Sequence, residues 1–144
     1  MSNFLSGWPA FALGSAFFAG LVVLFGKLGV QGIPSNLATF IRTLVIAPML
    51  LGFVAARREW VPLENLWGRS LVFLVLSAIA TGLSWACYYR ALQLGPASRV
   101  APADKLSVVF AITFGVAILG EPLSWPVVVG GLLIVSGTLV MLLA

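Results

Sequence analysis

The sequence predicts an all-α integral membrane protein with five transmembrane helices, and three observations support this fold class. The chain has 144 residues, of which 61% are hydrophobic and 8% are charged, with a mean hydropathy of +1.12. Soluble domains carry about 25% charged residues, so this chain has too few charges to cover a surface that faces water. Its apolar runs are long and do not alternate with polar residues as barrel strands do. In lipid, only helices or closed barrels satisfy every backbone group.

A transmembrane helix needs about 20 mostly apolar residues, and five segments of the chain meet this length. They span about residues 8–28, 36–56, 69–92, 97–119 and 124–143. The first carries no charge before Lys27, and the turn-forming run GVQGIPS separates it from the second. The second contains Arg42, and residues 57–68 after it are the only markedly polar connection in the chain.

The remaining breaks are short and contain glycine and proline. A Gly-Pro pair at 95–96 ends the third helix, and a Gly-Glu-Pro run at 120–122 separates the fourth helix from the fifth. The fourth helix carries Pro102, Asp104 and Lys105 in its first third, and we expect it to continue through them. The fifth helix is uncharged to its end.

The composition excludes several classes of function. The isoelectric point is near 10.0, but the eight Lys and Arg are scattered and form no basic stripe, which excludes a nucleic-acid binder. The chain has no His and one Cys, Cys87, which excludes His-based acid/base catalysis, Ser-His and Cys-His nucleophiles, disulfides and the usual zinc sites. We therefore expect no enzyme, no cofactor and no metal.

The distribution of Lys and Arg does not decide how the chain is oriented in the membrane. Five helices place the two termini on opposite sides. The side of the N-terminus holds Arg57, Arg58 and Arg69 near helix ends, and the other side holds Lys27, Arg90 and Arg99. The positive-inside rule therefore favours neither side. Two interpretations stay open: the polar loop with Arg57 and Arg58 makes the N-terminal side cytoplasmic, or the chain inserts both ways.

Several short motifs occur at characteristic positions along the chain. Arg42 lies in the run ATFIRTL near the start of the second helix, and the third helix ends in YYRAL at 88–92. Pro102 follows small residues at the start of the fourth helix, and Leu-Gly-Glu at 119–121 precedes the Gly-rich run GGLLIVSG. In this order and spacing, the motifs resemble an EamA-type domain of the drug/metabolite transporter superfamily over nearly the whole chain.

The resemblance implies that the chain is one half of an inverted-repeat transporter. Family members commonly have ten helices, in two five-helix repeats of opposite orientation, and this chain has one repeat. Alternating access in such transporters moves two related bundles around a site near the middle of the membrane. We therefore expect an antiparallel homodimer to supply the second bundle. The balanced Lys and Arg on the two sides fit the insertion in both directions that this dimer requires.

Gly130 and Gly137 lie seven residues apart in the last helix and are the candidate packing face. The small multidrug-resistance branch is similar in this respect, and there such a helix joins two antiparallel protomers. Small residues allow helices to approach closely in a membrane. Two interpretations stay open: the helix packs on this face against another helix of the same protomer, or against the second protomer.

Arg42 and Lys27 are charged side chains within the predicted helices and are therefore candidate substrate ligands. Arg42 lies about five residues inside the second helix, roughly 8–9 Å at about 1.5 Å per residue. Charges inside a membrane are costly and usually face a cavity or a partner, so we predict that Arg42 binds an anionic group. The alternative for both is that the long side chain reaches back to the interface, which the position of Lys27 at a helix end favours.

Asp104 and Lys105 form a second charged pair of candidates. As neighbours on one helix they are expected to point about 100° apart and not to face each other. Asp104 is predicted to carry a proton or to pair with Arg42, and Lys105 is predicted to attract the substrate. The alternative is an ion pair between helices that only stabilises packing.

Aromatic residues on the third helix are the remaining candidates for substrate binding. Trp85 lies at helical spacing from Tyr88 and Tyr89. Such rings can surround a cation or stack on a flat substrate. The alternative for the two tyrosines is an aromatic belt at the membrane interface.

Together these features predict a secondary transporter, an exporter in the inner membrane of the cell, whose partners are a small-molecule substrate, lipid and a second copy of the chain. Arg42, Lys105 and Lys27 outnumber the one acid, so the expected substrate is a small organic anion or zwitterion such as an amino-acid-like metabolite. Protons are the expected driving ions, with Asp104 as the acid inside a helix. Two alternatives stay open: an exporter of cationic drugs, and a membrane interaction or assembly protein that transports nothing.

Overall fold

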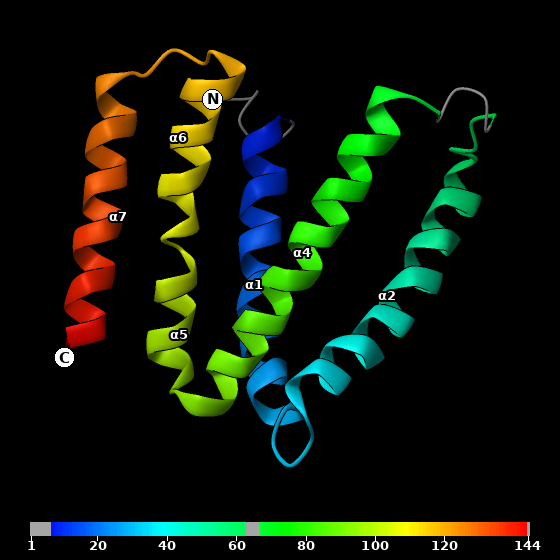
Figure 1. The fold of residues 1–144 in the computed structure, drawn as a ribbon, viewed down its shortest axis with the longest axis horizontal. Coiled ribbons are helices and arrows are strands. Elements are labelled where there is room, and N and C mark those ends of the chain that lie inside the picture. The colour runs from blue at the N-terminus through cyan, green and yellow to red at the C-terminus, as the bar shows by residue number, and fades with distance from the viewer. Residues whose placement is uncertain (1–6, 63–66, 144) are drawn as a thin grey trace. The chain divides into compact units, whose positions relative to one another are not determined.

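All regular structure in the computed structural model is helical within the residues that it describes, 7–62 and 67–143. The helices are α1 (Trp8–Gly29), α2 (Ser35–Arg57), α4 (Arg69–Leu94), α5 (Ala97–Asp104), α6 (Ser107–Leu119) and α7 (Trp125–Leu143) (Figure 1). Among these residues, five segments are long and apolar enough to cross a membrane, and α5 with α6 forms one of them. The predicted all-α fold with five spans is confirmed.

The ends of the spans agree closely with the breaks expected from the sequence. α4 continues to Leu94, two residues beyond its expected end, and the other spans agree within one residue. α6 stops before Gly120, whose φ of +69° lies in the left-handed region that favours glycine. The Glu121 N–H donates to the Gly115 carbonyl at 3.1 Å and closes the last turn. The Gly-Glu-Pro run therefore ends this helix as predicted.

The helices belong to two compact units. One comprises residues 25–93, with α2, most of α4 and the last residues of α1. The other comprises the residues up to Leu24 and from Leu94 onward, with α5, α6 and α7. In this second unit, α7 packs against both α5 and α6. The packing is close at Gly131 of α7, where a Cβ would lie 3.4 Å from Ile112 Cδ1 of α6.

The fourth predicted helix is interrupted, which corrects the expectation that it is continuous. α5 ends at Asp104 and α6 begins at Ser107. Between them, the N–H groups of Lys105 and Leu106 donate to carbonyls three residues earlier, with N···O distances of 2.9 and 3.1 Å. Bonds over three residues are those of a 3₁₀-helix, so the backbone here is wound more tightly than in an α-helix.

Thr138 on α7 stabilises this interruption. Thr138 is 4% exposed, and its hydroxyl donates to the Pro102 carbonyl at 3.3 Å. In a continuous α-helix that carbonyl would accept the N–H of Leu106, which here donates to the Ala103 carbonyl instead. A side chain that inserts into the hydrogen-bond ladder of a helix causes a kink. A residue 36 positions away along the chain thus bonds to the backbone at the interruption.

Thr138→Val is expected to destabilise the fold by about 0.5–1.5 kcal/mol, the net contribution of one hydrogen bond. Valine keeps the shape of threonine but removes one donor from the Pro102 carbonyl. The measurement is thermal unfolding in neutral detergent, followed by circular dichroism. Thr113→Val is the matched control, because Thr113 is exposed and its hydroxyl bonds within its own helix, to the Val109 carbonyl at 2.8 Å. Equal shifts for the two variants would show that the Thr138 contact adds no stability.

Candidate functional site

Arg42 is a charged residue of α2 that lies against aromatic side chains of α4. Its guanidinium carbon lies 5.2 Å from the centre of the Trp85 ring and 4.6 Å from the centre of the Tyr89 ring. Its Nη1 also donates a hydrogen bond to the Tyr89 hydroxyl. A cation within about 6 Å of a ring centre is attracted by the quadrupole of the ring. α4 therefore holds the guanidinium through the rings of Trp85 and Tyr89 and through the Tyr89 hydroxyl.

The spacing of the aromatic residues explains why two of them reach Arg42. Trp85 and Tyr89 are four residues apart on α4 and so share one face of the helix. Tyr89 is fully buried, while Trp85 and Arg42 are half-buried. Tyr88 packs edge-on against Tyr89, with ring centres 5.8 Å apart and ring planes at 87°. The predicted spacing thus places the three aromatic candidates in one cluster.

No carboxylate pairs with Arg42 among residues 25–62 and 67–93, the described part of its own unit. The ion pair found there joins Arg57 to Glu59 at 3.9 Å. A guanidinium has five N–H donors, and Tyr89 accepts from one of its nitrogens. The remaining donors match the two oxygens of a carboxylate or phosphate. The arrangement can therefore bind an anion.

Lys27 connects the end of α1 to the end of α4. Its ammonium group donates to the main-chain carbonyl of Leu92. The last four carbonyls of a helix have no partner within the helix, and a cation there also interacts favourably with the helix dipole. Gln93 strengthens the same connection, because its side-chain amide donates to the carbonyls of Val30 at 3.1 Å and Ile33 at 2.6 Å.

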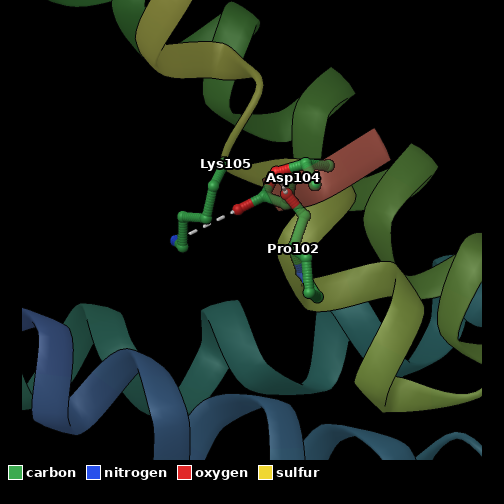
Figure 2. A network of polar contacts seen from close by, with 4 residues as sticks. Pro102, Asp104 and Lys105 are labelled. Carbon is green, nitrogen blue, oxygen red and sulfur yellow. Dashed lines mark hydrogen bonds and ion pairs between the residues drawn. The ribbon is translucent and has the colours of Figure 1, made fainter. Parts of the chain in front are cut away.

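Asp104 and Lys105 face each other, contrary to the expectation that they point apart. Figure 2 shows the Lys105 ammonium beside the Asp104 carboxylate, 3.4 Å from Oδ2. The expectation was wrong because it considered only the directions in which the two side chains start, whereas the flexible lysine side chain reaches the carboxylate beside it. The two side chains are 38% and 57% exposed, and such exposure of charges within a span is costly unless a cavity or a partner covers them. The pairing of Asp104 with Arg42 stays a prediction.

Gly130 and Gly137 have open space where a side chain would begin. A Cβ built at either position would have no neighbour within 4 Å beyond its own helix. The contact of α7 with α6 uses the adjacent Gly131 instead. The role of Gly130 and Gly137 in packing stays a prediction, and a second chain is the partner that such a role requires.

The structure thus brings Arg42, Trp85 and Tyr89 into one cluster within residues 25–93. Sequence reasoning missed Gly26, which lies against Tyr89. Nothing in the sequence distinguishes this residue among 15 glycines, because its role depends on a contact between two helices. Among residues 7–62 and 67–143, no group of three or more His, Cys, Asp or Glu lies close enough together to hold a metal ion.

Known proteins share the sequence pattern of this chain. The family model described as the EamA-like transporter family matches residues 6–143. A protein from a Sinorhizobium species named "Uncharacterized transporter in cobO 3'region" is 47% identical over 134 residues, which cover 93% of this chain and 95% of that protein. No solved structure gives a significant match.

Proposed function

The chain belongs to the EamA-like transporter family and is a multi-pass membrane protein, and from this premise we propose that it exports a small organic anion or zwitterion. An amino-acid-like metabolite is the expected type of substrate, and the inner membrane of the cell is the expected location. Transport proceeds by alternating access, with an antiparallel second copy of the chain as the other half.

The observation that carries this proposal is the environment of Arg42 in α2. Its guanidinium contacts the rings of Trp85 and Tyr89, and no carboxylate among the described residues of its own unit, 25–62 and 67–93, forms an ion pair with it. A charge within a membrane span is costly unless a partner balances it. The negative group of a substrate balances this charge and binds through the N–H groups that Tyr89 leaves free to donate.

The same contacts argue against the export of cationic drugs. The rings expected to surround a cationic substrate, Trp85 and Tyr89, already hold the Arg42 guanidinium. A cationic drug would have to displace Arg42 or bind beside a like charge, and like charges repel strongly away from water. Membership of a transporter family argues against a protein that only assembles other proteins.

Three observations support the antiparallel second copy. The Lys and Arg near helix ends number three on each side of the five spans, as insertion in both directions requires. A Cβ built at Gly130 or Gly137 of α7 would have no neighbour within 4 Å beyond its own helix, which leaves space for a second chain. The aligned region makes up 95% of the Sinorhizobium relative, so that protein consists of little beyond one repeat.

The ion pair at the interruption between α5 and α6 supports coupling to protons. Discontinuous helices form the substrate and ion sites of many secondary transporters, because their broken ends present backbone groups inside the membrane. Protonation of Asp104 changes the charge beside Lys105, the residue expected to attract the anionic substrate. Proton binding and substrate binding are linked in this way.

Thermal stabilisation of the purified protein in detergent tests the substrate class. The compounds are amino acids, other small carboxylates and organic phosphates, compared with quaternary ammonium drugs. We expect anions or zwitterions to raise the melting temperature, because a ligand that binds only the folded state stabilises it. Stabilisation by cationic drugs alone would contradict the proposal. Uptake of the stabilising compounds into proteoliposomes, with and without a pH gradient, then tests proton coupling.

Gly137→Leu is expected to convert the dimer in detergent into a monomer. Leucine places a bulky side chain on a face where the two helices must approach closely. The measurement is the molar mass by light scattering during size-exclusion chromatography. Gly82→Leu on α4 is the matched control, since a Cβ at Gly82 also has no neighbour within 4 Å. If both variants stay dimeric, α7 does not join the protomers.

A further inference from the structure

We propose that Gly26 is a positioning residue for the anion-binding guanidinium and that it acts through the buried ring of Tyr89. The inference rests on the proposed function, in which Arg42 binds the negative group of the substrate. Gly26 lies on α1, Tyr89 on α4 and Arg42 on α2, so one series of contacts connects three helices.

Gly26 leaves room for the Tyr89 ring. A Cβ at position 26 would lie 3.0 Å from Tyr89 Cε1, 3.3 Å from Tyr89 Oη and 3.5 Å from Leu92 Cδ1. Carbon atoms in favourable contact are about 3.5–4.0 Å apart, so a methyl group at Gly26 would press on the ring. Glycine therefore allows the Tyr89 ring to approach more closely than any other residue at this position would.

The ring has little freedom to move away from position 26. Tyr89 is 1% exposed, and Leu92, the second neighbour of Gly26, is 0% exposed. The helices are also held together beside this contact, because Lys27 donates to the Leu92 carbonyl. Closely packed interiors transmit strain, so an added methyl group displaces the ring and does not simply fill a space.

A displaced Tyr89 ring changes the position of Arg42 directly. The Tyr89 hydroxyl accepts a hydrogen bond from Arg42 Nη1, and the ring centre lies 4.6 Å from the guanidinium carbon. The strength of a hydrogen bond falls steeply as its geometry departs from linear. An alanine at position 26 therefore leaves the charge of Arg42 in place but changes the direction in which its donors face an anion.

NMR spectroscopy of the arginine side chains tests this positioning without any substrate. In protein labelled with nitrogen-15 arginine, the N–H protons of a guanidinium bonded to a buried phenol exchange slowly with water. We expect one such signal, which disappears in Arg42→Lys and in Tyr89→Phe. Gly26→Ala should shift and weaken it, whereas Gly20→Ala should not, because a Cβ at Gly20 on the same helix has no neighbour within 4 Å. An unchanged signal in Gly26→Ala overturns the proposal.

Uptake of the anion identified by thermal stabilisation separates positioning from a general structural role. We expect Gly26→Ala to raise the half-saturating concentration by about three- to tenfold, with little change in the maximal rate. The melting temperature should fall little, because the preference of alanine over glycine in a helix offsets part of the strain from the added methyl group. In a Tyr89→Phe background, Gly26→Ala should raise the half-saturating concentration by less than about twofold, since both substitutions act through the same hydroxyl. If the effects of the two substitutions on the half-saturating concentration are fully additive, the proposal is overturned.

The two measurements distinguish this inference from its premise. A changed signal in Gly26→Ala with unchanged anion uptake supports the positioning of Arg42 by Gly26 and contradicts the role of Arg42 in transport. If Gly26→Ala does not fold, Tyr89→Leu is added, because leucine removes the ring that the new methyl group would meet. Recovery of folded protein in this double variant supports the contact, and no recovery overturns it.

Discussion

Arg42→Gln is expected to raise the half-saturating concentration of an anionic substrate by about 10- to 100-fold, because hydrogen bonds to a charged group contribute about 1.5–3 kcal/mol. Glutamine keeps polar atoms near Trp85 and Tyr89 but removes the positive charge and most of the donors. The measurement is the concentration dependence of uptake into proteoliposomes that contain equal amounts of purified variant.

Two further variants define what the effect means. Arg57→Gln is the charge-matched control, because the Arg57 side chain is 78% exposed and pairs with Glu59 at the end of α2. Exposed ion pairs contribute about 0–1 kcal/mol, so this variant should keep an almost normal half-saturating concentration. Arg42→Lys keeps the charge but loses the planar fork that binds two oxygens, and it should recover only part of the affinity. Equal uptake by Arg42→Gln and Arg57→Gln would exclude Arg42 from substrate binding.

The C-terminus is expected to lie on both sides of the membrane in different copies of the chain. Reporters fused to the C-terminus, one active only inside the cell and one active only outside, should both give a signal. The reason is that neither side has an excess of Lys and Arg. A signal from one side alone would contradict the antiparallel homodimer and would favour a parallel oligomer or a separate partner of opposite orientation.

Charge variants should turn this mixture into a single orientation and abolish transport. Arg57→Ala with Arg58→Ala leaves one basic residue near helix ends on the N-terminal side against three on the other, which should become cytoplasmic. Arg90→Ala with Arg99→Ala creates the opposite excess and is the matched control. Each double variant alone should transport at background level. Co-expression should restore uptake, because it supplies both orientations. Full uptake by either variant alone would exclude the antiparallel arrangement.

The spans and their ends follow from local sequence. Runs of apolar residues long enough to cross a membrane predicted five helices, and the described residues contain five such segments. The Gly-Glu-Pro run at 120–122 predicted the end of α6, where Gly120 takes the left-handed conformation. Both features depend only on residues that are neighbours along the chain, and for this reason the sequence was sufficient to predict them.

The sequence predicted which residues belong to the candidate site, but it did not predict which of them contact one another. Arg42, Trp85 and Tyr89 were each expected to serve the substrate, the first by charge and the others as rings around a cation. In the structure the rings contact Arg42 itself, so the cation that they hold belongs to the protein. Helical spacing predicts which residues share a face of α4, but it does not predict which residue of another helix meets that face.

The sequence by itself determined that this is a five-span helical membrane protein with charges inside its spans. Only the tertiary structure decided where the fourth span is interrupted and which glycine matters. Thr138 donates to the Pro102 carbonyl from 36 residues away, and Gly26 makes room for the buried ring of Tyr89. Both depend on two helices that pack against each other, and the periodicity of one helix contains no information about the side chain that its neighbour presents.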